Sequence, residues 1–177
     1  GYVTQVTDMV GLKIPIITHP LQAFVTQSYQ PVLDRVVASA DLHIYVSQSA
    51  RGEMLVGAEI DPYTSYATRS TFTFAASTAA RAIDLFPFMA KLRLLRQWSG
   101  LCDMTPDYSP LLGTTPIDGF YLSTGWGTRG FKAIPIGGKA MAELIATKRV
   151  PEITAPLGLD RYERDRCVSA RASAGTH

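Results

Sequence analysis

Apolar and polar residues alternate along three stretches in the first third of the chain, which predicts β-strands. In residues 16–29, one face carries Leu21, Ala23 and Val25, and the other carries Gln22, Phe24 and Thr26. Residues 42–48 and 53–61 each place apolar side chains on one face: Leu42, Ile44 and Val46 in the first, and Met54, Val56, Ala58 and Ile60 in the second. The short segment "SARG" between these two stretches predicts a β-hairpin.

Residues 75–90 change to the spacing of an amphipathic helix. Small and apolar residues recur there at intervals of three and four, at Ala76, Ala79, Ala80, Ile83 and Phe86. Pro87 is expected to end this helix or to distort its last turn. Farther along, residues 92–101 predict a strand, the polar and proline-rich residues 105–116 predict a loop, and residues 119–125 predict a short strand.

The glycine-rich sequence "GWGTRGFKAIPIGGKAMAELI", residues 125–145, predicts a turn followed by the last helix. An early proline, an apolar stripe and a basic C-terminal end support this helix. These residues are Pro135, then Met141, Leu144 and Ile145, then Lys148 and Arg149, with Pro151 to end the helix. Residues from 154 onward are expected to form a tail with an exposed or poorly ordered end. Antiparallel strands around one long helix, followed by strand, glycine turn and helix, indicate an α+β fold.

The composition narrows the classes of function. With 177 residues, 46% of them hydrophobic, the chain is long enough to bury a core. The net charge is only +2 and no basic stripe is interleaved with aromatic residues, so we expect no nucleic-acid partner. No apolar run approaches the roughly 20 residues that cross a bilayer, so we expect no membrane segment. The first sixteen residues lack the basic and then apolar order of a signal peptide.

The cysteines and histidines give no metal-binding pattern. Cys102 and Cys167 form neither a disulfide framework nor a metal-ligand spacing, which favours reduced thiols in a cytoplasmic protein. His19, His43 and His177 lie far apart in the sequence, so a zinc site is not expected and no cofactor role is assigned to them.

The turn before the last helix is the most distinctive chemical feature. A strand that ends in glycines and leads into a helix brings bare backbone N–H groups to the positive end of the helix dipole. That arrangement suits an anion, or a ring that becomes electron-rich. The alternative is a tight turn that only packs the helix on the sheet. The sequence matches neither GxxxxGK[ST] nor GxGxxG within a long βαβ unit, which excludes phosphate-loop and dinucleotide interpretations here.

Residues 98–145, "WSGLCDMTPDYSPLLGTTPIDGFYLSTGWGTRGFKAIPIGGKAMAELI", resemble the C-terminal flavin-contacting segment of the D-amino-acid-oxidase-like FAD family. Within that family they resemble most the β subunits of heterotetrameric sarcosine oxidases. The shared motifs are an aromatic–x–Gly start, the "DMTPD" loop, a strand and the "GWGTRGFK" turn. The segments "THPLQAFVTQ", "HIYVSQSARGEMLVGAEIDPYTSYATR" and "LFPF" resemble the same subunits in the same order.

This resemblance implies a division of the chain into three regions. Residues 1–100 would form the substrate-binding region, an antiparallel or mixed sheet with a long helix. Residues 101–150 would form a flavin-binding segment that returns to a Rossmann-like FAD-binding domain, whose N-terminal part is absent from this sequence. Residues 151–177 would be a C-terminal tail.

The resemblance also implies roles for individual residues. In the family, the backbone of this turn holds the pyrimidine edge of the flavin, and Lys132 matches the lysine that binds the substrate carboxylate and contacts the cofactor. The alternative for Lys132 is a solvated lysine at the start of a helix. The turn falls here on Gly127, Thr128, Arg129, Gly130 and Phe131, with Thr128 as a turn former. Arg129 departs from the histidine, glycine or aromatic residue of relatives, and its side chain is expected either near the pocket or on a surface.

Four further residues are candidates or informative departures. Tyr45 matches a strand face that contributes a tyrosine to the substrate cavity of simpler relatives, with ordinary core packing as the alternative. Asp103 and Asp107 are either acid–base groups or turn formers. Leu55 stands where monomeric sarcosine oxidases carry an oxygen-activating lysine, in an ungapped comparison anchored on a nearby glycine. An apolar residue there fits a flavin that passes its electrons onward.

The resemblance implies part of an FAD-dependent amine oxidase that demethylates sarcosine to glycine and formaldehyde or methylene-tetrahydrofolate. FAD would bind noncovalently, and electrons would pass to FMN, attached through the absent half at a subunit interface, and then to oxygen. The expected partners are the other sarcosine oxidase subunits, sarcosine and tetrahydrofolate. One alternative is the β subunit of an oxidase or dehydrogenase for opines or other secondary amino acids. Another is a non-catalytic interaction fragment.

Overall fold

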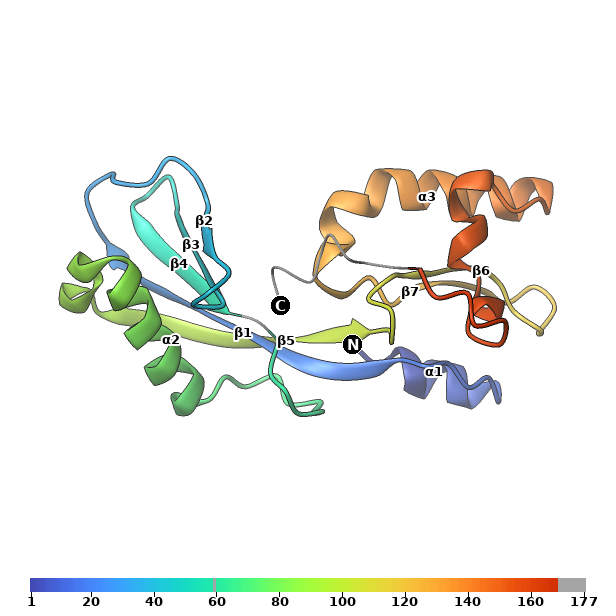
Figure 1. The fold of residues 1–177 in the computed structure, drawn as a ribbon, viewed down its shortest axis with the longest axis horizontal. Coiled ribbons are helices and arrows are strands. Elements are labelled where there is room, and N and C mark those ends of the chain that lie inside the picture. The colour runs from blue at the N-terminus through green and yellow to red at the C-terminus, as the bar shows by residue number, and fades with distance from the viewer. Residues whose placement is uncertain (59, 169–177) are drawn as a thin grey trace. The chain divides into compact units, whose positions relative to one another are not determined.

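The computed structural model describes residues 1–58 and 60–168, and Figure 1 labels its elements. The chain forms two compact units. Unit 1 contains residues 1–18 and the described residues from 102 onward, and unit 2 contains residues 19–101. The boundaries between the units fall inside the long strands β1 (Ile17–Ser28) and β5 (Leu94–Met104). Helices combined with an antiparallel sheet confirm the predicted α+β class.

The main sheet has five strands in the order β2-β3-β4-β1-β5. Its other strands are β2 (Val37–Ser39), β3 (Ile44–Gln48) and β4 (Glu53–Ala58). Strands β3 and β4 pair antiparallel, with Val46 opposite Val56 and Gln48 opposite Met54, so the predicted hairpin is confirmed. Strand β2 was not predicted, because three residues are too short to show an alternation. Glu59, at the end of the third predicted stretch, lies outside the described residues.

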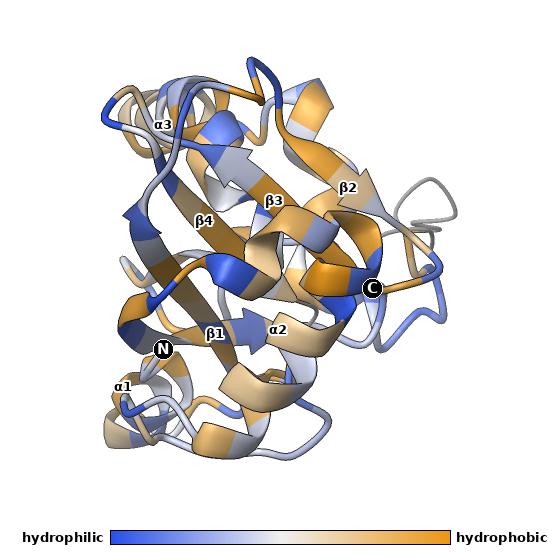
Figure 2. Cartoon of the chain, turned by 90° about the vertical axis from the view of Figure 1, so that its left-hand side faces the viewer, coloured by the Kyte–Doolittle hydropathy of each residue, from blue (hydrophilic) through white to orange (hydrophobic). Residues whose placement is uncertain are grey.

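Helix α2 (Phe72–Leu85) and the 3₁₀ helix η1 (Pro87–Lys91) cover one face of this sheet, and α2 lies in front of β1, β3 and β4 in Figure 2. The helix begins at Thr71, whose hydroxyl accepts a hydrogen bond from the Phe74 backbone N–H at 3.1 Å. The core between helix and sheet consists of Phe24, Ile44, Val46, Met54, Val56, Ala58, Phe74, Ala82 and Met89.

The predicted apolar stripe of this helix is confirmed in part, because Ala79, Ile83 and Phe86 are partly buried and pack against the core. Ala76 and Ala80 are exposed, whereas the buried residues are Phe74, Ala75, Thr78 and Ala82. Phe74 sets the rotation, because its large ring meets Phe24 of β1 edge-on, with the ring centroids 6.4 Å apart. The helical period then carries Thr78 and Ala82 to the same side.

Strand β1 buries its more polar face. Gln22, Phe24 and Thr26 are buried, whereas on the opposite face Ala23 is buried and Leu21 and Val25 are half-buried. The polar side chains are satisfied within the structure: the Gln22 amide donates to Asp61, and the Thr26 hydroxyl accepts from the Met54 backbone N–H at 3.1 Å. Buried polar groups with such partners are compatible with a core.

Unit 1 contains a second, two-stranded sheet of β6 (Leu111–Thr114) and β7 (Tyr121–Thr124), together with α1 (Val3–Met9) and α3 (Gly130–Thr147). The predicted loop over residues 105–116 is therefore wrong in its second half. Leu111 and Leu112 are buried, and Leu111 pairs opposite Thr124 of the predicted strand β7. A four-residue strand between proline-rich turns is too short for its periodicity to be read from the sequence.

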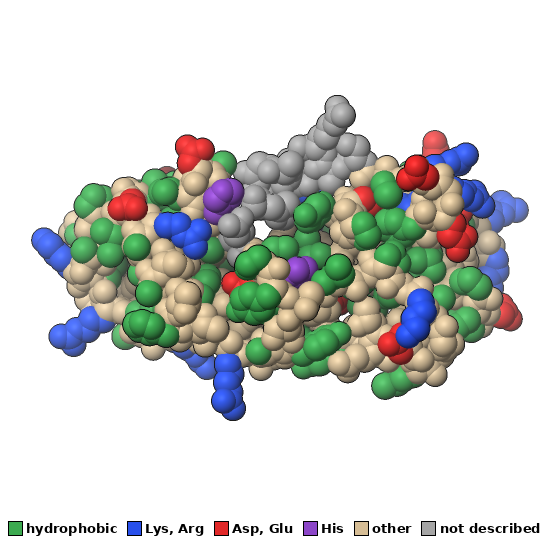
Figure 3. All heavy atoms as spheres, turned by 60° about the horizontal axis from the view of Figure 1, so that its bottom comes forward, with side chains coloured by type: hydrophobic (Ala, Val, Ile, Leu, Met, Phe, Trp, Pro, Cys, Tyr) green, Lys and Arg blue, Asp and Glu red, His purple; other side chains and the backbone are tan. Residues whose placement is uncertain are grey.

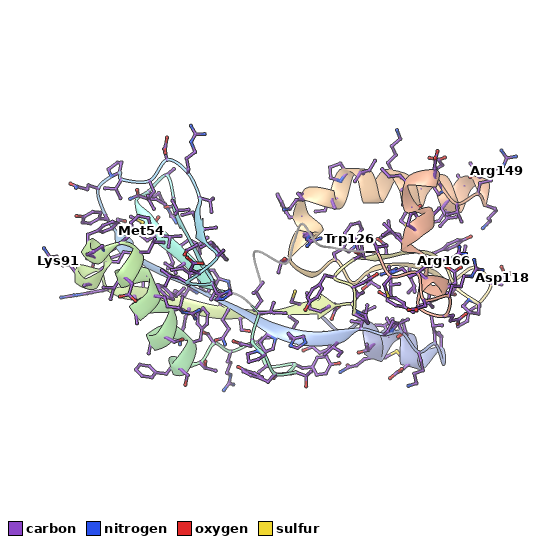
Figure 4. All side chains as sticks on the ribbon, viewed as in Figure 1. Met54, Lys91, Asp118, Trp126, Arg149 and Arg166 are labelled. Carbon is purple, nitrogen blue, oxygen red and sulfur yellow. The ribbon has the colours of Figure 1, made fainter. Side chains whose placement is uncertain are left out.

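Helix α3 begins at Gly130, so Pro135 lies in the second turn rather than at an early position. Its buried residues are Gly137, Ala140 and Leu144, while Ile145 of the predicted stripe is exposed. The indole of Trp126 lies along the first two turns of the helix, against Gly130 and Gly137 (Figure 4). Lys148 ends the helix in a left-handed conformation with a φ of 58°.

The segment after α3 packs on unit 1 instead of forming a free tail. It contains the 3₁₀ helices η3 (Glu152–Leu157) and η4 (Leu159–Arg161), and Thr154 and Arg161 are buried. Residues 169–177 lie outside the described residues. The division of the chain into functional regions stays a prediction. Within residues 1–58 and 60–168, no helix is both long and apolar enough to cross a membrane.

Candidate functional site

The turn between β7 and α3 depends on two glycines. Gly125 and Gly127 have φ values of 67° and 54°, in the left-handed region that side chains disfavour. A Cβ on Gly125 would lie 2.7 Å from the methyl group of Thr105, and one on Gly127 would lie 3.1 Å from the sulfur of Met104. Both conformation and space therefore require glycine at these two positions.

The helix that follows has no side-chain cap. The 3₁₀ helix η2 (Gly127–Arg129) leads directly into α3, and within residues 1–58 and 60–168 no side chain accepts a hydrogen bond at the start of either element. The first N–H groups of a helix have no partners within the helix and carry the positive end of its dipole. An uncapped start of this kind can receive an anion or a polar ring edge.

The six predicted turn residues, 127–132, form η2 and the first residues of α3. Gly127, Thr128 and Arg129 form η2, and Gly130, Phe131 and Lys132 open α3. Phe131 is 91% exposed, and Lys132 is also exposed. No carboxylate of the described residues pairs with the Lys132 ammonium. The Lys132 ammonium lies close to the positive end of the helix dipole, where a cation is unfavourable. An anion bound at this place would therefore stabilise both the ammonium and the start of the helix.

Arg129 lies half-buried at the same turn. Its Nη2 atom is buried and has no hydrogen-bond partner in the part of the chain that the structure describes. Buried guanidinium N–H groups are normally paired, because leaving one unpaired costs free energy. The buried Nη2 atom of Arg129 could therefore donate a hydrogen bond to an acceptor that the described residues do not supply.

Tyr45 lies on β3 in unit 2, opposite Gly57 of β4. Its half-buried ring occupies the space where a side chain on residue 57 would stand. Burial raises the pKa of the Tyr45 hydroxyl, so the phenol stays neutral at physiological pH. Leu55 points to the same face of the sheet, because it lies two residues from Gly57 on β4, and this is the face opposite α2.

The two acid–base candidates have structural partners. The Asp103 carboxylate accepts a hydrogen bond of 2.6 Å from the Thr18 hydroxyl. Asp107 accepts from the Ser109 backbone N–H at 3.3 Å, which confirms its turn role, and it also forms a buried ion pair with Arg161. Arg161 was not predicted, because it lies in the segment expected to be a tail.

The remaining polar groups suggest no second site. Among the described residues, no three His, Cys, Asp or Glu side chains are placed to hold a metal ion, and His177 lies outside them. Cys102 and Cys167 are free thiols. Burial raises the pKa of Cys102 to about 11, which makes it a poor nucleophile. Lys and Arg side chains are spread over the face shown in Figure 3 and are interspersed with Asp and Glu.

Comparison with known proteins extends these observations. A family model described as FAD dependent oxidoreductase matches residues 1–144. The chain is 38% identical to the sarcosine oxidase subunit beta of Arthrobacter sp over 98% of its length, and 42% identical to that of Rhizobium meliloti (strain 1021) over 93%. Among solved structures, L-proline dehydrogenase from P. horikoshii matches 93% of the chain and 45% of its own, with a TM-score of 0.85 and 25% identity.

These relatives are longer than this chain. The aligned part covers 43% of the Arthrobacter subunit and 39% of the Rhizobium subunit. The chain therefore spans about two fifths of the length of the curated relatives that it matches.

Proposed function

Because the chain belongs to the family of FAD-dependent oxidoreductases, we propose that residues 125–132 hold the flavin ring of FAD in a protein that oxidatively demethylates sarcosine. The similarity to sarcosine oxidase β subunits over nearly the whole chain supports this proposal. The observation that carries it is the start of α3, which follows a glycine turn and for which the described residues supply neither a side-chain cap nor a carboxylate partner for Lys132.

The residues of this turn fit the pyrimidine edge of a flavin. Gly125 and Gly127 set the path of the turn, because the space beside them is filled by the side chains of Thr105 and Met104. The N–H groups at the start of α3 can donate to ring oxygens and nitrogens, and the helix dipole stabilises negative charge at that edge. Phe131, exposed beside the turn, fits a surface that is covered when the cofactor and the rest of the protein are present.

Lys132 has the chemistry to hold the substrate. Its ammonium is a compact point charge that suits a carboxylate. Anchoring the carboxylate of sarcosine fixes the N-methyl group at a defined distance from the anchor. Tyr45 would contribute a neutral hydroxyl group to the substrate cavity. We assign both residues orienting roles, with no proton transfer to the lysine.

The reaction follows from the substrate. FAD held by residues 125–132 would supply the acceptor for the hydride that the N-methyl carbon of sarcosine gives up. The nitrogen also loses a proton and an imine forms, which water converts to glycine and formaldehyde. Transfer of the same carbon to tetrahydrofolate would give the methylene derivative instead. The residues of this chain orient the amine and stabilise charge.

The complete protein would act as one subunit of a hetero-oligomer. The names of its relatives, which call them subunits, support this assignment. We propose that electrons leave FAD for an FMN at a subunit interface, held by residues outside this chain, and then reach oxygen. Half-exposed, apolar Leu55 fits such an onward transfer, because it provides no charge to stabilise superoxide. A cytoplasmic location agrees with the two free thiols.

Anaerobic addition of sarcosine to the full-length, FAD-loaded protein tests this function. We expect the visible flavin absorbance to bleach, with glycine and formaldehyde as products. Proline serves as a comparison secondary amine. If proline bleaches the flavin while sarcosine leaves it oxidised, the assignment to sarcosine is wrong.

One observation favours a second candidate, an oxidase or dehydrogenase for opines, which are secondary amino acids with two carboxylates. Arg129 offers a second cation three residues before Lys132, with a buried N–H that lacks a partner. Residues three apart lie on one side of a helical turn, so the two cations could each take one carboxylate. Arg129→Ala would then lower kcat/KM for an N-(carboxyalkyl) amino acid but not for sarcosine. The exposed Arg149, changed to Ala, is the control. Equal effects of Arg129→Ala on both substrates would reject this candidate.

A further inference from the structure

Arg161 stands out because its whole guanidinium group is buried and paired. Its side chain is 3% exposed and that of its partner Asp107 is 4% exposed. Nε donates to one Asp107 oxygen at 2.9 Å and Nη2 to the other at 3.0 Å, a bidentate pair between residues 54 apart in the chain. Such pairs fix orientation as well as distance.

The remaining donors bind three backbone carbonyls. Nη2 donates to the Ser109 carbonyl at 2.8 Å, and Nη1 donates to those of Leu157 and Gly158 at 2.8 and 3.2 Å. The three nitrogens of the guanidinium thus reach two carboxylate oxygens, three carbonyl oxygens and the hydroxyl oxygen of Tyr162. A lysine, with one nitrogen, cannot reproduce this planar set of donors.

The Asp107 carboxylate of this pair also accepts two further hydrogen bonds. The Tyr162 hydroxyl donates to Asp107 at 2.7 Å, and the Val168 backbone N–H donates to the same carboxylate at 3.0 Å. Burial opposes the ionisation of Asp107, but these bonds and the Arg161 pair outweigh it, and the pKa of Asp107 lies below its ordinary value. The carboxylate is therefore fully charged at physiological pH.

The contacts continue from this pair to the turn that precedes α3. The Ser109 carbonyl, which binds Arg161, also accepts a hydrogen bond of 2.7 Å from the Thr105 hydroxyl. Thr105 is buried, and its methyl group lies against Gly125, in the place where a Cβ would stand. Gly125 opens the glycine turn. Arg161, Asp107, Ser109 and Thr105, the Arg161 network, thus connect the C-terminal segment to that turn.

We propose that Arg161 is a positioning residue for the flavin turn, acting through the Arg161 network on Gly125. This inference rests on the proposed function, because the turn matters only where it holds a flavin. Preorganised backbone donors are effective when their position is fixed before the ligand binds. Arg161 fixes it from a segment more than thirty residues beyond the turn.

Arg161→Lys in the full-length, FAD-loaded protein tests the proposal. We expect the visible circular dichroism of the bound flavin to change and the dissociation constant for FAD to rise about tenfold, as for the loss of one charged hydrogen bond. Arg164→Lys is the matched control, because Arg164 forms an exposed pair with Asp160 in the same segment. Its flavin spectrum and FAD affinity should match those of the wild type.

If Arg161→Lys melts at a lower temperature but keeps the wild-type flavin spectrum and FAD affinity, Arg161 is merely structural and the inference is overturned. Should that variant fail to fold, Tyr162→Phe takes its place, because it keeps the ion pair and removes the two hydrogen bonds that the Tyr162 hydroxyl makes with Asp107 and Arg161. The flavin spectrum of Tyr162→Phe should change, and an unchanged one overturns the inference. A wild-type protein that takes up no FAD rejects the proposed function itself.

Discussion

The ring of Tyr45 lies directly over the backbone of Gly57, its antiparallel partner on the neighbouring strand β4. A Cβ on residue 57 would fall among the ring atoms, so the glycine creates the place that Tyr45 occupies. The pair lies on the sheet face opposite α2, where Leu55 is also found. The position proposed for the substrate tyrosine is thus fixed by a residue that has no side chain.

This relationship predicts an energetic coupling between the two residues. Gly57→Ala should lower the free energy of unfolding by about 1–3 kcal/mol, because the added methyl group overpacks a filled position. In a Tyr45→Ala background the same change should cost less than about 1 kcal/mol, because the ring is gone. Urea unfolding of the four proteins gives the double-mutant cycle. Equal costs in the two backgrounds would show that the ring does not occupy this place.

The contact between Trp126 and Gly137 predicts that two neighbouring glycines of α3 respond differently to substitution by alanine. A Cβ on Gly137 would lie 3.0 Å from two carbon atoms of the indole, whereas nothing lies within 4 Å of a Cβ on the neighbouring Gly138. Gly137→Ala should therefore destabilise the protein by about 1–3 kcal/mol and shift the Trp126 fluorescence emission. Gly138→Ala should stabilise the helix by about 0.5–1 kcal/mol, because alanine favours helix over glycine. Similar effects of the two changes on stability would contradict this packing.

The lowered pKa of Asp107 predicts that the free energy of unfolding falls in acid. Its folded pKa is lowered, because the Arg161 and Tyr162 hydrogen bonds outweigh burial, and its unfolded pKa is about 3.9. A group of this kind contributes stability that is complete above the unfolded pKa and is lost as the pH falls through the folded pKa. Below about pH 4, this carboxyl should lower the unfolding free energy by up to about 1.4 kcal/mol per pH unit.

Asp107→Asn should remove this component. The variant should be less stable at neutral pH, because Arg161 keeps its charge and loses its partner, and its stability should depend less on pH below 4. Asp84→Asn, on the exposed side of α2, should leave the pH dependence unchanged. Denaturant unfolding at a series of pH values provides the measurement. A wild-type slope in Asp107→Asn would assign the acid sensitivity to other groups.

Much of the architecture could be predicted from the sequence, because regular alternation and the hairpin segment report local structure. Strands β3 and β4, with Ile44, Val46, Met54 and Val56 facing the core, follow the predicted pattern. The glycine turn and the helix after it were also found at the expected place. In these segments the local pattern and the tertiary packing agree, so the sequence was sufficient.

The features that were missed depend on contacts between distant residues. The rotation of α2 follows from the contact of Phe74 with Phe24, and the buried polar face of β1 follows from partners such as Asp61. The Arg161 pair is the extreme case, since its two members are 54 residues apart and neither has a local pattern that reveals the other. Periodicity carries no information about such pairings.

The central claim, that Lys132 at the start of α3 holds the carboxylate of the substrate beside the flavin, is tested most directly with an unreactive carboxylate ligand such as acetate. Its dissociation constant can be measured from the perturbation of the flavin spectrum in the full-length, FAD-loaded protein. We predict that Lys132→Met raises this constant roughly 10- to 100-fold, as expected for the loss of a charged hydrogen bond, while Lys139→Met on the same helix leaves it unchanged. A Lys132→Met protein that retains its flavin and binds the carboxylate as tightly as the wild type would contradict the claim.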